Sequence, residues 1–70
     1  MKLYQFREEG GPHIALTADV LGDRLPRDGR VWQMRGPVDL DDPEVGRIGV
    51  SAEEIARAVE QHGHFIWPRD

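Results

Sequence analysis

One stretch of the chain, residues 51–63, combines an apolar stripe with start and stop signals for an α-helix. Ser51 and Glu54 form a capping box, in which the two side chains satisfy backbone N–H groups at the helix start. Gly63 stands where a left-handed C-terminal cap is expected. Apolar residues recur between them at helical spacing: Ala52, Ile55, Ala56 and Val59. The pattern predicts a helix over Ala52–His62 with one face buried.

The rest of the chain predicts short β-strands separated by turns. Alternating apolar and polar residues mark each expected strand, and Gly- and Pro-containing stretches mark the turns. The first two strands are expected to form a hairpin across the turn at residues 8–12. Gly36–Pro37 is expected to end the third strand and to separate it from the fourth. The expected strands cover residues 3–7, 13–18, 30–35, 38–40 and 64–67.

Together these elements predict a single α+β domain spanning residues 1–70. A small antiparallel sheet of four to five short strands packs one face against the helix in the C-terminal half. Because one helix covers one face only, the second face is expected to be polar or to contact another molecule. A chain of 70 residues has one thin core.

The chain contains no cysteine, so neither a disulfide nor a thiolate ligand is available. This absence favours a reducing, cytoplasmic setting. The first seven residues lack the apolar run of a signal peptide, and no stretch reaches the ~20 apolar residues that span a bilayer. No cofactor and no membrane partner are expected.

The negative charge of the chain is concentrated in one window, residues 37–54. Six acidic residues and one basic residue give this window a charge of −5, whereas eight bases and seven acids elsewhere give +1. A local field of this kind can steer a partner toward one surface. The candidate partner-binding residues are Asp39, Asp41, Asp42, Glu44, Glu53 and Glu54.

Two other interpretations of these acids remain open. A solvated loop followed by acids in the first helical turn needs no partner, because the helix dipole favours Glu53 and Glu54 there. Calcium binding is a weaker alternative. An EF-hand loop beginning at Asp39 needs Gly at position 44 and Glu at position 50, where this chain has Glu44 and Val50.

The three histidines are His13, His62 and His64, and they raise the alternative of a small metal-dependent enzyme. Their spacing is unspecific, and His62 is equally expected as a cation at a helix C-terminus. The single serine of the chain caps the helix, so no serine triad can form. A chain this short leaves little room for a substrate pocket. We therefore expect no enzymatic activity and no bound metal.

A basic cluster surrounds Trp32 and raises the alternative of direct nucleic-acid binding, with phosphates on the arginines and a base stacked on the ring. Its members are Arg24, Arg27, Arg30 and Arg35. Asp23 and Asp28 interrupt the cluster, and the chain has a pI of about 5.2. A nucleic-acid-binding domain normally has a cleaner basic face, so no direct binding is expected.

The sequence thus predicts a small non-catalytic protein-binding module, monomeric or homodimeric, that occupies a basic surface of a larger protein through its acidic window. The size and charge of the chain suit an inhibitor of host nucleic-acid machinery that is made by a phage or mobile element. Anti-CRISPR proteins are an example. This comparison is an analogy of size and charge and not a residue match. One alternative is a homodimeric module that pairs through an open sheet face or edge. The other is the histidine-based metalloenzyme.

Overall fold

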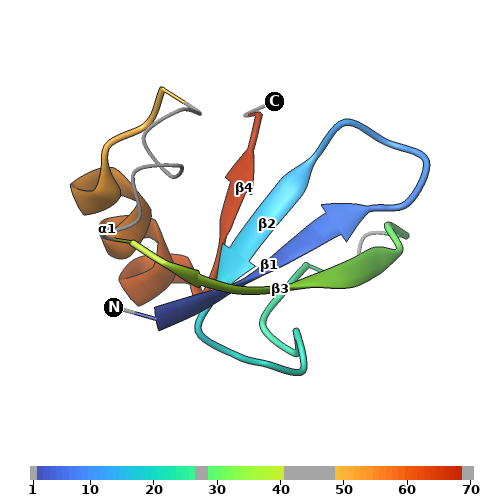
Figure 1. Ribbon diagram of the computed structural model, residues 1–70, viewed down its shortest axis with the longest axis horizontal. Helices are drawn as coiled ribbons and strands as arrows, with labels where there is room; N and C mark the ends of the chain where they lie inside the picture. The colour runs from blue at the N-terminus through green and yellow to red at the C-terminus, as the bar shows by residue number, and fades with distance from the viewer. Residues whose placement is uncertain (1, 27–28, 41–48, 69–70) are drawn as a thin grey trace.

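The computed structural model describes residues 2–26, 29–40 and 49–68. Within these ranges the chain forms a four-stranded antiparallel sheet with the strand order β3-β1-β2-β4 and one helix, α1, against it (Figure 1). This arrangement confirms the predicted α+β fold. The elements are β1 (Lys2–Glu8), β2 (Ile14–Thr17), β3 (Trp32–Asp39), α1 (Ala52–His62) and β4 (Phe65–Trp67).

Helix α1 has the predicted bounds and the predicted caps. The Ser51 hydroxyl oxygen accepts a hydrogen bond from the Glu54 backbone N–H at 3.1 Å. At the other end Gly63 adopts the left-handed conformation, with φ +83°, and its N–H donates to the Val59 carbonyl at 2.8 Å. In the described part of the chain, no helix is long and apolar enough to cross a membrane.

Removing the helix cap gives a first testable expectation. Ser51→Ala should lower the free energy of unfolding by about 0.5–2 kcal/mol, because the Glu54 N–H loses its acceptor. Urea denaturation measures the difference. Gln61→Ala, at an exposed position of the same helix, is the control and should shift stability by no more than about 0.5 kcal/mol. Equal unfolding midpoints for Ser51→Ala and the parent would contradict the cap assignment.

The pairing of β1 with its neighbours confirms one expectation and corrects another. β1 and β2 form the predicted hairpin, with Phe6 opposite Ala15. β3, however, runs unbroken through Gly36–Pro37, so the predicted separate strand at residues 38–40 is wrong. Because β3 is an edge strand, Pro37 can lack its N–H without leaving a neighbouring strand unpaired. The irregularity appears instead as a register shift between Gln5 and Phe6 of β1.

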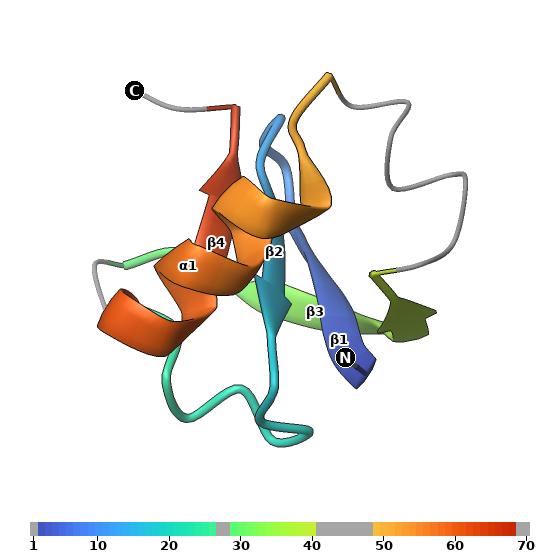
Figure 2. The ribbon, with the colours of Figure 1, turned by 90° about the vertical axis from the view of Figure 1, so that its left-hand side faces the viewer.

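The main core lies between the sheet and α1, which contacts β2 and β4 (Figure 2). Leu3 of β1 and Ile55 of α1 have no exposed surface, and Leu16 pairs with Phe65 across β2 and β4. Burial of such side chains is the principal stabilising term in a domain of this size. The buried members of this core are Leu3, Leu16, Leu40, Val50, Ile55, Val59 and Phe65.

The second sheet face is covered in part by the chain's own segment between β2 and β3, of which residues 18–26 and 29–31 are described. Leu25 is buried there with Phe6 and Ala15, and Trp32 packs against the same cluster. A side chain at Gly22 would touch the Phe6 ring, so the segment lies directly on it. The second face was expected to be polar or to contact another molecule. This expectation is wrong where Leu25 and Trp32 pack on Phe6 and Ala15. The sequence predicts strands at residues 13–18 and 30–35 and no covering role for the residues between them.

Candidate functional site

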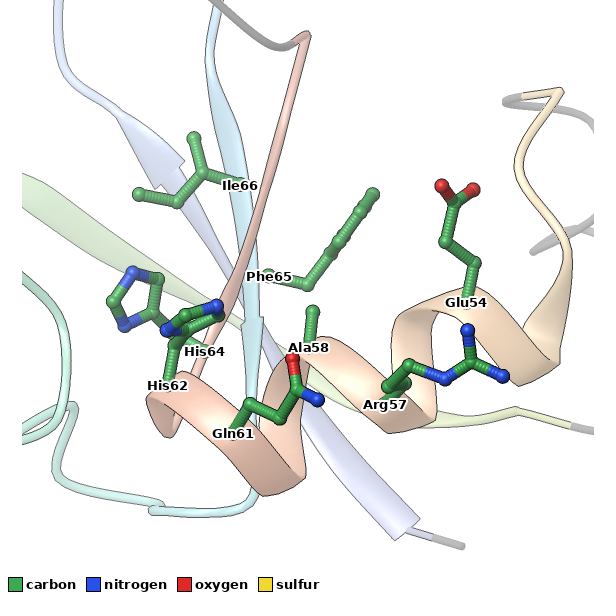
Figure 3. A pocket seen from close by; sticks show the side chains of 8 residues that line it. All are labelled: Glu54, Arg57, Ala58, Gln61, His62, His64, Phe65 and Ile66. Carbon is green, nitrogen blue, oxygen red and sulfur yellow. The ribbon is translucent and has the colours of Figure 1, made fainter.

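A groove of about 420 Å³ lies between α1 and the edge strand β4 (Figure 3). Its floor is apolar and consists of Ala58, Phe65 and Ile66. Phe65 is buried, whereas Ala58 and Ile66 are half-buried. Trp67 stacks on Phe65 with ring centroids 6.4 Å apart and fixes the aromatic ring beneath the groove. The groove therefore lies between one helix and one strand and has an apolar floor, in which Phe65 itself is almost fully buried.

The rim of the groove is polar and comes mainly from the solvent side of α1. Glu54, Arg57 and Gln61 are exposed and follow one another at helical spacing. They lie beside the buried stripe of Ile55 and Val59, which holds the helix on the sheet. The same stripe that anchors α1 thus fixes the direction in which these rim side chains face.

Two histidines close the end of the groove where α1 ends, opposite Glu54 (Figure 3). The Nδ1 atom of His64 lies 2.9 Å from the Arg24 carbonyl oxygen. Because a carbonyl can only accept a hydrogen bond, Nδ1 carries the proton and Nε2 is the nitrogen left for another partner. His62 lines the same end and is exposed. This end therefore presents imidazole nitrogens, whereas the guanidinium of Arg57 lies toward Glu54 at the other end (Figure 3).

Charge along the groove changes from one end to the other. Glu53 and Glu54 occupy the first turn of α1, where the helix dipole favours carboxylates. Arg57 follows one turn later, and His62 stands in the last turn. Of the two acids only Glu54 lines the groove, so a ligand there would meet one carboxylate beside the Arg57 guanidinium at one end and the two imidazoles at the other. Such an arrangement can orient a bound segment by charge.

The remaining predicted acidic residues do not line this groove in the described structure. Asp39 ends β3 opposite Lys2, and the next pair along, Leu3 and Val38, packs into the core below α1. Because successive residues of a strand face opposite sides, Asp39 points to the sheet face away from the helix that holds Glu53. Asp41, Asp42 and Glu44 lie outside the described residues. Asp39 therefore does not share the helix-side surface of Glu53 and Glu54, and a role of these acids in partner binding stays a prediction.

His13 belongs to a different part of the molecule. Its Nδ1 atom lies 2.8 Å from Glu8 Oε1 at the β1–β2 turn, and Arg30 Nε lies 3.5 Å from the other carboxylate oxygen. His62 and His64, in contrast, line the α1–β4 groove. Among residues 2–26, 29–40 and 49–68, no three side chains of the metal-binding types are grouped to hold an ion.

Sequence reasoning singled out Glu54 as a partner-binding residue, and His62 and His64 only as metal-site candidates, but missed the other groove residues. Arg57 and Gln61 were detectable as a polar ridge beside the apolar stripe, at helical spacing from Glu54. Arg57 and Gln61 border a groove only because β4 pairs with β2 at the sheet edge next to the helix. No local pattern in the sequence specifies that pairing.

Comparisons with protein-family models, with curated proteins and with solved structures gave no match for this chain. The candidate function therefore depends on the chemistry of the groove and on the distribution of charge.

Proposed function

We propose that this chain is a small non-catalytic protein-binding module that takes a cationic segment of a larger protein in the α1–β4 groove. The observation that supports this most is the groove itself, with an apolar floor that includes Phe65 and a polar rim that includes the carboxylate of Glu54. An apolar centre with a polar border is the usual anatomy of a protein interface. Grooves beside a helix are recurrent sites for short peptide segments.

The charge sequence along the groove favours one orientation of the bound segment. A lysine or arginine of the partner would lie near Glu53 and Glu54, and an apolar side chain would rest on Phe65. Carbonyl or carboxylate oxygens of the partner would then face Arg57 and the histidines. The charge of −5 in residues 37–54 supports electrostatic attraction of such a partner.

A basic surface that normally binds nucleic acid is the partner class that this proposal favours. Phosphate-binding surfaces are rich in lysine and arginine, so an array of carboxylates can compete for them. The module would then act as an inhibitor by occupancy, without chemistry on its target. The analogy with phage-encoded inhibitors, anti-CRISPR proteins among them, stays one of size and charge.

The two sheet edges argue against self-association by strand pairing. β4 has three residues and is followed by Pro68, which has no N–H to extend a ladder. β3 is longer but has Pro37 in its second half and a register shift against β1. Short strands, prolines and irregularities of this kind commonly protect edges from pairing. A heterologous partner in the groove is therefore favoured over a second copy at an edge.

A charge-neutralising double variant tests the proposal. Glu53→Gln with Glu54→Gln removes two negative charges, and the glutamine introduced by the second change can still complete the capping box. The probe is a fluorescent ten-residue peptide with alternating lysine and arginine around a central phenylalanine. Anisotropy should show affinity falling about fivefold to tenfold in the double variant, since each exposed pair contributes up to ~1 kcal/mol.

Glu60→Gln is the matched control, because Glu60 is exposed on the same helix but lies outside the first turn that holds Glu53 and Glu54. It should leave the affinity within about twofold of the parent. Raising NaCl from about 50 to 300 mM should weaken binding to the parent protein. Equal losses in the control and the double variant, or binding that ignores salt, would contradict the proposal.

A further inference from the structure

A second hollow, of about 390 Å³, lies where β1 ends and β3 begins. In Figure 1 this end of the sheet is remote from α1, and Figure 2 agrees, with α1 nearest the viewer and β3 behind it. The hollow is therefore separate from the α1–β4 groove. Its walls include two arginines from neighbouring strands, Arg7 and Arg35.

The strand register brings the cationic groups of this hollow together. Arg7 of β1 is directly opposite Gln33 of β3, so their side chains leave the same face of the sheet. Arg35 stands at the register shift of β3 and lines the same hollow. All three side chains are exposed. Among the described residues, neither Arg7 nor Arg35 has a carboxylate partner.

Of the two acidic residues that line the hollow, Glu8 and Glu9, Glu8 is already engaged. Glu8 contacts His13 through one carboxylate oxygen and Arg30 through the other. Its side chain also folds against Gly11, where any side chain at position 11 would collide with the carboxylate. Glu8 is thereby held to the β1–β2 turn. Glu9 also lines the hollow, together with the two arginines.

We propose that this hollow binds a phosphate group, held by the guanidinium groups of Arg7 and Arg35 with the Gln33 amide as a further donor. Arginine presents its N–H groups as a planar fork that matches phosphate oxygens, and two forks suit a dianion. The ligand is a small phosphorylated compound or free phosphate. A nucleic-acid strand is disfavoured, because it requires a basic stripe and this chain has a net charge of −4 with Glu9 beside the site.

The test is a titration of the ¹⁵N-labelled protein with inorganic phosphate, with NaCl adjusted to hold the ionic strength constant. We expect saturable shifts at the amides of Arg7, Gln33 and Arg35. Arg7→Ala and Arg35→Ala should each weaken phosphate affinity about fivefold to tenfold. Arg35→Lys should also weaken it, because lysine keeps the charge but lacks the fork.

Lys2→Ala is the control, since Lys2 is an exposed cation at the start of β1 and lines neither the groove nor the hollow. It should leave phosphate affinity unchanged, and each variant should keep the dispersed spectrum of the folded parent. Shifts that rise without saturation, or equal losses in the control, would overturn the site. A ten-residue thymidine oligonucleotide that binds more tightly than phosphate, with the same dependence on Arg7 and Arg35, would overturn the assignment to a small ligand.

Discussion

Ile55→Ala is expected to lower the free energy of unfolding by about 2–5 kcal/mol. Ile55 has no exposed surface and packs in the main core with Leu3, Leu16 and Phe65. Its truncation removes buried apolar area and leaves a cavity in the core between α1 and the sheet. A chain of this length has a total stability of roughly 3–10 kcal/mol, so this single change removes a large fraction of it.

Urea denaturation followed by circular dichroism measures this effect. Leu21→Ala is the matched control, because Leu21 is 76% exposed and loses apolar atoms without leaving a cavity. Its stability should stay within about 0.5 kcal/mol of the parent. Ile55→Val, a smaller deletion, should cost about 0.5–1.5 kcal/mol. An Ile55→Ala protein that unfolds at the parent midpoint would show that the buried face of α1 is assigned wrongly.

Thr17→Val is expected to lower the free energy of unfolding by about 1–3 kcal/mol. Thr17 ends β2, is fully buried and donates its hydroxyl hydrogen to the Gly63 carbonyl at 2.8 Å. The same hydroxyl oxygen accepts from the Asp19 N–H at 3.3 Å. Valine has nearly the same shape but leaves the Gly63 carbonyl without its donor. The hydroxyl therefore connects the end of the sheet to the C-terminal cap of α1.

The direction of the Thr17→Val change separates two explanations. If apolar burial alone determined stability, valine would equal or exceed threonine, because it replaces a polar atom with a methyl group. If the hydrogen bond to Gly63 matters, valine is less stable despite its greater hydrophobicity. Thermal unfolding by calorimetry distinguishes these results. A Thr17→Val protein as stable as the parent would contradict the role given to the hydroxyl.

The parts of the fold that sequence predicts are those determined by neighbouring residues. The helix from Ala52 to His62 and its caps at Ser51 and Gly63 depend on groups within four residues of each other. The β1–β2 hairpin likewise follows from one short turn. β3 differs, because whether Pro37 interrupts a strand depends on whether another strand lies on that side, which is a property of the whole sheet.

The candidate site shows the same division between local and long-range information. Charge in the sequence identified Glu53 and Glu54, since the first helical turn exposes them wherever the helix packs. The groove next to them depends on β4 returning to pair with β2, and the phosphate hollow depends on Arg7 and Arg35 lying on adjacent strands. Both features join residues far apart in sequence, and their spacing along the chain has no characteristic pattern.

The central claim is that a cationic protein segment binds between α1 and β4. The most direct test is amide chemical-shift mapping during titration with the lysine–arginine–phenylalanine peptide. The account predicts saturable shifts concentrated at Glu53–Arg57 and His64–Ile66, which weaken as NaCl is raised. Shifts centred on the hollow at Arg7 and Arg35, or spread evenly over the protein, would contradict it.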